Sequence, residues 1–240
     1  MESSKKRYAL MIAAGLLTIT LLVLLFLIKD TRADMLYGDG AEVNLGMSSL
    51  NVHLLENGKA VDQDDQNKGK LLGSVSKSME PGYTYEEKIA ADNDGDLSEY
   101  VRIIVKKYWK DSQGKRLDMD PAKIVLSYGD KDYNDADWVL NPGETTKEQT
   151  VYYCRKALAS GETSKPLFDG IKLDARIAYD YSLKKSEDGK DITAVYKYDG
   201  AQIGFEAEVQ SVQSGSADKA ITSAWGDTGV AVVDDEIVVK

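Results

Sequence analysis

The sequence has little cysteine and little histidine, and this scarcity excludes several kinds of site. Cys154 is the only cysteine, so no intrachain disulfide can form and the fold has to depend on its apolar core. A buried thiol is the expected state of Cys154, with an intermolecular disulfide as the alternative. Zinc hydrolysis needs several histidine, cysteine or carboxylate ligands, and His53 is the only histidine. We therefore predict a surface His53, no zinc centre and no catalytic residue.

Other motifs that carry chemistry are also missing. Gly-x-Ser-x-Gly and glycine-rich phosphate loops do not occur. The 240 residues include 30 basic and 40 acidic side chains, which gives a formal net charge of −10. Nucleic-acid-binding proteins need clustered Lys and Arg side chains to contact phosphates, so this excess of acidic residues excludes nucleic acid as a partner. The same acidity fits a soluble extracellular domain better than one that lies on anionic lipid.

One long apolar run is present, at Tyr8–Ile28, and it contains no charged residue. As a helix rising about 1.5 Å per residue, it is long enough to cross the roughly 30 Å of bilayer hydrocarbon. Lys5, Lys6 and Arg7 precede it, and a positive flank indicates a cytoplasmic N-terminus. No comparable run follows Ile28. We therefore predict that the rest of the chain is exported to the cell surface or the extracellular space.

The fate of this leader, residues 1–33, has two alternatives. Signal peptides usually have apolar cores of about 7–15 residues and a cleavage site with small residues. This core is longer, and Lys29, Asp30 and Arg32 follow it at once. Cleavage by a signal peptidase after Ala33 is one alternative. A retained anchor that holds the chain in the membrane through residues 8–28 is the other.

Residues 34–226 are predicted to form one β domain. Fourteen tyrosines against three phenylalanines suit half-buried sheet positions. Roughly nine short alternating segments separated by turn signals predict an all-β, antiparallel, jelly-roll-like sandwich. The predicted strands are Met47–Glu56, Leu71–Ser76, Tyr83–Ala91, Tyr100–Trp109, Ile124–Tyr128, Thr150–Leu158, Lys172–Leu183, Ile192–Tyr198 and Gln202–Val212.

The end of the sequence changes pattern. Apolar residues at helical spacing predict one short helix over Ala217–Trp225, which Gly226 can cap. Residues 227–240 are a C-terminal extension whose two apolar runs could form a further strand or a hairpin. We expect Trp225, at the end of the helix, to plug one end of the sandwich.

An acidic turn, Asp92-Asn93-Asp94-Gly95-Asp96, is the segment that most resembles a calcium loop. Hard oxygen ligands at Asp92, Asp94 and Asp96 would suit Ca²⁺. An EF-hand loop also needs glycine at its sixth place and glutamate at its twelfth, where this chain has Leu97 and Ile103. An Asx-rich turn between two strands is the stronger interpretation, and calcium binding is the alternative.

Several spaced motifs, taken together, resemble the TasA/camelysin family of exported proteins of Gram-positive bacteria, which includes many clostridial-type members processed by the SipW type of signal peptidase. The resemblance covers about residues 8–226. After the apolar segment the matching pieces are Val43–Gly46, Leu50–Glu56, Glu80-Pro81-Gly82, Asn93-x-Gly95, Tyr100–Arg102, Val151–Tyr153, Leu158, Gly161–Thr163, Pro166–Phe168, Ala207–Gln210, and Ala217, Ala220 and Ala224 with Trp225-Gly226.

The resemblance implies a jelly-roll-like fold and a secreted protein that assembles into biofilm-matrix fibres. In such fibres a strand of one subunit completes a sheet of the next. The donor would lie in Asp34–Leu45, with Val43 and Leu45 as the candidate strand residues and the neighbourhood of Asn51–Leu55 or another edge strand as acceptor. The charged exit of the leader and the extension at 227–240 depart from the family pattern.

Three functions follow from these observations. The first is a non-enzymatic matrix-fibre subunit, or an accessory to one, which associates with itself or with related subunits. The second is a membrane-anchored ectodomain that binds a surface partner or a glycan without polymerising. The third is a camelysin-like peptidase, which the missing zinc ligands disfavour.

Overall fold

The computed structural model describes residues 50–61, 71–72, 79–187 and 190–240, all of which belong to one unit, Ser48–Lys240. The predicted leader, its cleavage residue Ala33 and the donor residues Val43 and Leu45 lie outside the described residues. The predicted strand over Leu71–Ser76 also lies largely outside them. Within the described ranges, none of the helices has the length and apolar character needed to cross a membrane.

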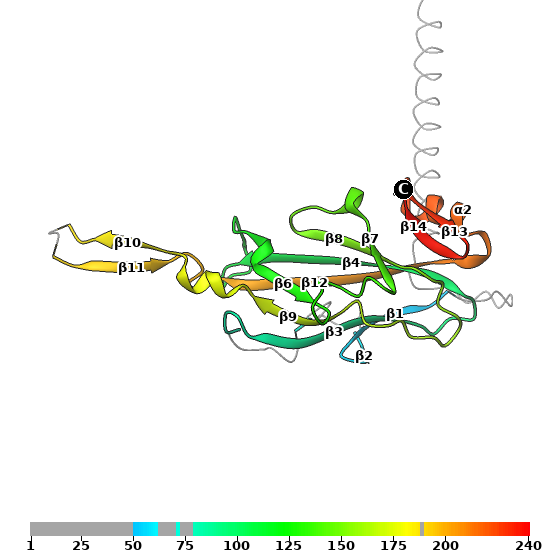
Figure 1. Cartoon of the computed structure of the whole chain (residues 1–240), viewed down its shortest axis with the longest axis horizontal. Coiled ribbons are helices and arrows are strands. Elements are labelled where there is room, and N and C mark those ends of the chain that lie inside the picture. Colours follow the sequence, from blue (N-terminus) through cyan, green and yellow to red (C-terminus); the bar gives the residue numbers. More distant parts are fainter. Residues whose placement is uncertain (1–49, 62–70, 73–78, 188–189) are drawn as a thin grey trace, which may run out of the picture. The chain divides into compact units, whose positions relative to one another are not determined.

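Two antiparallel sheets form most of this unit (Figure 1). The first sheet has five strands, in the order β2 (Lys59–Ala60), β1 (Val52–Glu56), β3 (Thr84–Asn93), β9 (Phe168–Leu173) and β6 (Ile124–Ser127). The second has the order β12 (Gln202–Gln213), β4 (Glu99–Lys110), β8 (Gln149–Cys154) and β7 (Trp138–Leu140), with β5 (Arg116–Leu117) paired to the end of β4.

Two hairpins and five short helices complete the described chain. One hairpin is β10 (Tyr181–Lys185) with β11 (Ile192–Tyr196), and the other is β13 (Val230–Val233) with β14 (Glu236–Val239). The helix α2 spans Ala217–Trp225. Single turns of 3₁₀ helix lie at η1 (Pro121–Lys123), η2 (Pro142–Glu144), η3 (Ala175–Tyr179) and η4 (Ser214–Ser216).

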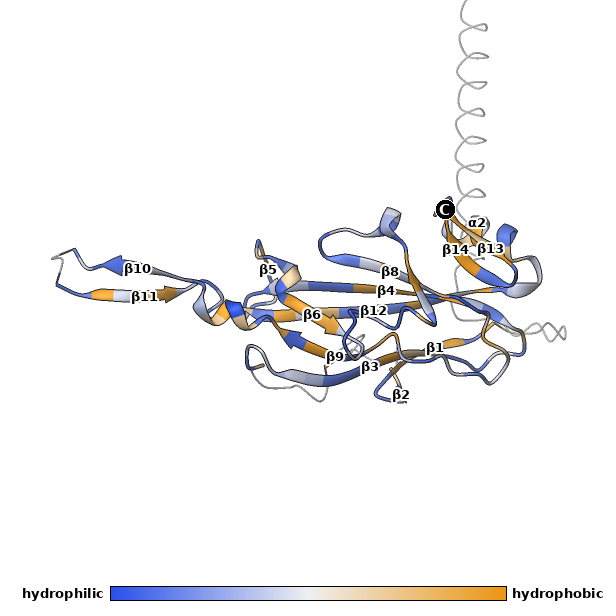
Figure 2. Cartoon of the chain, viewed as in Figure 1, coloured by the Kyte–Doolittle hydropathy of each residue, from blue (hydrophilic) through white to orange (hydrophobic). Residues whose placement is uncertain are grey.

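The main core lies between the two sheets, as strand alternation predicts. Val101, Ile103 and Val105 of β4 are buried there, and so are Phe205 and Val209 of β12. From the other sheet Ile89 and Phe168 join the same cluster, and the fully buried Trp109 and Trp138 also belong to it. Figure 2 shows the hydrophobic residues along these strands.

A second buried cluster lies on the outer face of the β4 sheet. Tyr100, Val151, Tyr153 and Val212 come from the sheet, Ile221 from α2 and Ile237 from β14. Both faces of β4 are therefore buried, which explains its nearly continuous burial over Glu99–Ile103. The C-terminal extension covers this outer face and pairs as a hairpin.

Most predicted elements are confirmed. The antiparallel all-β architecture, the helix over Ala217–Trp225 and a hairpin in 227–240 are all present. Gly226 ends the helix with a φ of 81°, and its N–H donates to the carbonyl of Thr222. The turn at Pro81-Gly82 is also present, with Gly82 at a φ of 85°, a conformation that favours glycine.

Two expectations were wrong. A continuous strand over Lys172–Leu183 does not form, because β9 ends at Leu173 and η3 intervenes before β10. The Asp174 carboxylate accepts from the backbone N–H of Arg176 and starts that helical turn, a local bond that outcompetes the alternating pattern. Trp225 does not plug the space between the sheets; it is half-buried and packs on the outer face against the ring of Tyr153.

Candidate strand-acceptor edge

The strand β12 forms one edge of its sheet and is the longest edge strand among the described residues. It spans twelve residues and pairs over its whole length with β4. No described residue pairs with its other side. An unpaired strand edge of this length is a template for another strand.

The hydrogen-bond pattern of β4 identifies the residues of β12 that face this open side. On the β8 side, the Lys107 N–H of β4 donates to the Glu148 carbonyl, and Glu99 exchanges backbone hydrogen bonds with Leu158. The backbone N–H and C=O groups of odd-numbered residues of β4 therefore point away from β12, and those of even-numbered residues point toward it. In the β4–β12 register, even-numbered residues of β4 stand opposite even-numbered residues of β12, and these bond to each other. The backbone groups of the odd-numbered residues of β12 therefore face the open side, at Ile203, Phe205, Ala207, Val209 and Ser211.

The other sheet presents its own edge beside β12. β1 pairs with β3 over all five of its residues. On its outer side β2 pairs with Leu55 and Glu56, and the Leu54 carbonyl accepts from the Val61 N–H. β1 and β12 lie close together in space. The neighbourhood of Asn51–Leu55, expected next to an acceptor, thus lies at the same open side of the two sheets as β12.

Glu99 fixes the point where the described chain enters β1. Its side chain is fully buried, and its Oε1 accepts from the backbone N–H of Asn51 at 3.1 Å. Asn93, the last residue of β3, lies nearby. Its amide donates to the carbonyls of Leu97, Leu158 and Ala159, at 2.8 to 3.1 Å. These hydrogen bonds tie the start of β1 to β4, and the loop at Leu158–Ala159 to the end of β3.

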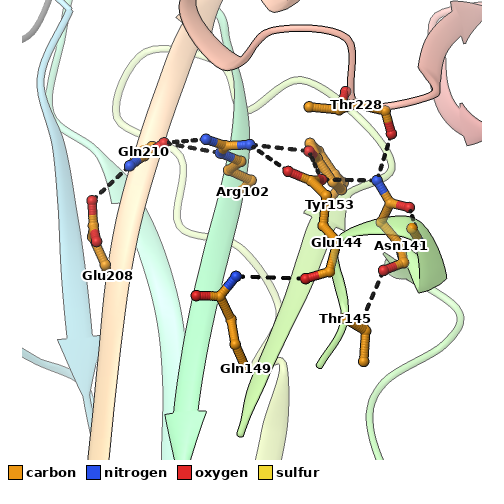
Figure 3. Close-up of polar contacts among 10 residues, drawn as sticks. Arg102, Asn141, Glu144, Thr145, Gln149, Tyr153, Glu208, Gln210 and Thr228 are labelled. Atoms are coloured by element: carbon orange, nitrogen blue, oxygen red, sulfur yellow. Dashed lines mark hydrogen bonds and ion pairs between the residues drawn. The ribbon is translucent and has the colours of Figure 1, made fainter. Parts of the chain in front are cut away.

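A polar row crosses the outer face of the same sheet and holds β12 in register (Figure 3). Arg102 of β4 stands directly opposite Gln210 of β12 and Tyr153 of β8. The guanidinium donates to Gln210 Oε1 at 2.7 and 2.9 Å, and to the Tyr153 hydroxyl at 3.2 Å. Glu144 of η2 completes the row with an ion pair to Arg102 Nη1 at 3.2 Å.

The same row binds the C-terminal extension. Tyr153 donates to Glu144 Oε2 at 2.5 Å, and burial raises the pKa of Tyr153, which keeps it a neutral donor. Asn141 donates to Glu144 and to the Thr228 carbonyl, each at 2.8 Å. The ring of Trp225 lies 4.8 Å from the Arg102 guanidinium carbon, a cation–π distance. These contacts couple β12, β4 and the extension.

The acidic turn does not gather its three aspartates around one point. Asp92 accepts from the Thr163 hydroxyl at 2.5 Å, whereas Asp94 lies 4.0 Å from His53 Nε2. In the described part of the chain, no three His, Cys, Asp or Glu side chains are arranged to hold a metal ion. Gly95 N–H donates to Asn93 Oδ1 at 2.9 Å, which is the Asx turn that the sequence predicts. Calcium binding stays an untested alternative.

Cys154 and His53, the other two residues considered from the sequence, lie where the sequence predicts. Cys154 is buried opposite Trp138, and burial raises the pKa of its thiol to about 11. The prediction of a buried thiol is confirmed, and a protonated thiol is unreactive. His53 is half-exposed on β1, which agrees with its predicted place on the polar side of a strand.

Glu87 is a buried titratable residue that the sequence analysis did not identify. It lies on the inward face of β3, where its side chain is fully buried. Its Oε2 accepts from the Asn57 amide at 3.3 Å, and the Glu56 carboxyl group lies within hydrogen-bonding distance. Burial, reinforced by Glu56, raises the pKa of Glu87 from 4.5 to about 8. The inward position follows from strand alternation, but the sequence carries no sign that Glu56 is adjacent.

Glu87 gives the fold a testable pH dependence. Because its folded pKa lies above 4.5, the folded state holds a proton that the unfolded chain releases first. Its contribution to stability is therefore full below about pH 4.5 and is lost as pH rises through about 8. We expect Glu87→Gln to flatten the decline in unfolding free energy between pH 5 and 8, as measured by urea unfolding.

The matched control is Glu86→Gln, because Glu86 is the adjacent exposed residue. Its ion pair with Lys88 lowers the pKa of Glu86, the opposite direction. This variant should keep the decline of the wild-type chain. A decline that persists in Glu87→Gln would show that Glu87 is not the responsible group.

No family model, curated protein or solved structure matches this chain.

Proposed function

We propose that this chain is an exported, non-enzymatic structural protein of a Gram-positive bacterium, which assembles into extracellular matrix fibres by strand addition. The observation that carries the proposal is the edge of β12 that no described strand pairs with, where five alternate residues have outward backbone groups. An extended segment of another subunit would pair there, as peptides do in strand-addition complexes. The resemblance to the TasA/camelysin family supports the same function, together with a jelly-roll-like arrangement of the two sheets.

The edge has features that suit a selective acceptor. Glu206 and Glu208 stand on the outer face of β12, and edge charges discourage indiscriminate pairing. The polar row of Arg102, Gln210, Tyr153 and Glu144 keeps β12 in register with β4 and leaves the open side of β12 available. Cleavage after Ala33 would free a segment ending in Val43 and Leu45 as the donor. Calcium, zinc and catalysis have no part in this proposal.

The test is a proline in the open edge. Ala207→Pro removes an outward N–H without removing a hydrogen bond to β4, and proline is tolerated on strand edges. We expect the variant to remain folded and to lose at least tenfold in fibre yield, measured by sedimentation and electron microscopy of protein from a Gram-positive host. The control is Leu140→Pro on β7, at the opposite edge of the same sheet, which should still give fibres.

A membrane-anchored ectodomain is the second candidate, and the charged exit of the leader favours it. Lys29, Asp30 and Arg32 follow the apolar run directly, where a cleavage site would have small residues. In that case the chain stays full-length in the membrane fraction and binds its surface partner or glycan as a monomer. Wild-type fibre yield near zero, with a folded chain, would favour this candidate over the first.

A further inference from the structure

The β10–β11 hairpin stands apart from both cores. Every residue of its two strands is exposed, and neither strand pairs with any other described strand (Figure 1). An isolated two-stranded hairpin is marginally stable in water unless something covers one of its faces. Its surface is therefore the part of the described chain most in need of a partner.

One face of the hairpin is apolar and the other is largely polar. Opposite residues of an antiparallel pair share a face, so the register defines three cross-strand pairs on one side. Tyr181 and Tyr196, whose rings lie 5.5 Å apart, form the first pair. The other two pairs are Leu183–Ala194 and Lys185–Ile192.

The apolar side chains of this face are unusually exposed to solvent. Leu183 is 64% exposed and Ile192 is 61% exposed, while each of the two tyrosines is 50% exposed. Figure 2 shows hydrophobic colour on β11 at a distance from the core strands. The reverse face carries Ser182, Lys184, Thr193 and Val195. We call the apolar side, Tyr181, Leu183, Lys185, Ile192, Ala194 and Tyr196, the hairpin face.

Charge indicates what can cover the hairpin face. Between Asp180 and Lys197, four lysines balance four acidic residues, so the chain's net charge of −10 resides entirely outside the hairpin. Two copies of the acidic body repel each other, and so do the body and an anionic membrane. A neutral apolar face is where two copies can meet with the least repulsion.

We propose that the hairpin face docks on the same face of a second copy, with the two hairpins antiparallel. A two-fold axis along the central pair places Leu183 against Leu183 of the other copy. The outer pairs then exchange, so that Tyr181 meets Lys185 and Tyr196 meets Ile192. The aromatic ring and the ammonium group form a cation–π contact, and the other rings cover apolar atoms.

The antiparallel arrangement also follows from charge. It puts the two acidic bodies at opposite ends of the paired hairpins, whereas a parallel arrangement would bring them together. The face has six residues, fewer than the roughly 20–30 per partner of a standard interface. Two free copies would therefore pair weakly, and copies already held close together would pair strongly. This inference rests on the proposed function and adds a second contact between its subunits.

The test uses a cysteine on each face of the hairpin. Cys154 is buried and protonated, so the native chain has no competing thiol. Leu183→Cys and the control Lys184→Cys are treated with a short bis-maleimide, in which each maleimide adds one thiol. We expect Leu183→Cys to give at least tenfold more cross-linked dimer than Lys184→Cys. Equal yields from the two faces would overturn the proposal.

A second pair of variants tests the face without relying on one cysteine. Ile192→Asp places a charge in the hairpin face, and Val195→Asp places the same charge on the reverse face. In the Leu183→Cys background, Ile192→Asp should reduce cross-linking about tenfold and Val195→Asp should leave it unchanged. A thermal unfolding midpoint shared by all variants shows that the cores are intact, since no hairpin residue belongs to them.

Fibre yield separates failure of this inference from failure of the proposed function. Fibres that form while both faces cross-link equally would overturn the hairpin contact alone. Face-specific cross-linking of the cysteine variants, together with a wild-type chain that forms no fibres, would overturn the proposed function and support the hairpin contact.

Discussion

Replacing Trp138 with alanine is expected to lower the free energy of unfolding by about 3–5 kcal/mol. Its side chain is fully buried in the main core, opposite Cys154. Its indole Nε1 donates to the Lys165 carbonyl at 3.0 Å, so the substitution also leaves that acceptor without its partner. Urea unfolding, monitored by circular dichroism, measures the change.

The informative comparison is Trp225→Ala. Trp225 has the same side chain but is half-buried on the outer face, where it contacts Tyr153 and Arg102. Because it loses less buried area, its cost should be about 1–2 kcal/mol. An equal cost at both positions would contradict the assignment of Trp138 to the core and Trp225 to the periphery.

Arg102→Ala is the second substitution with a large expected effect. The Arg102 side chain is 10% exposed and that of Glu144 is 24% exposed, so removing the guanidinium leaves a carboxylate mostly buried without its counter-ion. Breaking such a pair costs about 3–5 kcal/mol. Gln210 and Tyr153 lose hydrogen bonds at the same time.

Arg116→Ala is the surface control for this experiment. Arg116 pairs with Glu148 and stacks on the ring of Tyr108, but its side chain is 53% exposed. Its removal should cost less than about 1 kcal/mol. The double variant Arg102→Met with Glu144→Gln should recover part of the loss, because no charge then remains buried. A double variant as unstable as Arg102→Ala would mean that the pair itself is not the source of the loss.

The sequence predicted the elements that depend on local pattern. Alternation identified Val101, Ile103 and Val105 as the inward face of β4, and helical spacing located the ends of α2. It did not predict that Arg102, which alternates with these residues, would also be buried. That burial depends on α2 and the 227–240 hairpin packing from far along the chain, which no local pattern encodes.

The candidate sites were predicted less completely for the same reason. Alternation suggested a strand over Lys172–Leu183, but the capping bond of Asp174 was stronger than the pattern. The paired carboxyl groups of Glu56 and Glu87 meet only because β1 and β3 are neighbours in the sheet. In the sequence, the two strands of the hairpin face have the same alternating pattern as the core strands. Alternation does not reveal whether another element covers the apolar side of a strand pair.

The intact mass and N-terminal sequence of the protein recovered from the matrix of a Gram-positive host test the central claim most directly. Assembly by strand addition needs a free donor segment, so the account predicts fibres made of a chain that begins at Asp34. A full-length chain that keeps residues 1–33 and stays with the membrane fraction would contradict it.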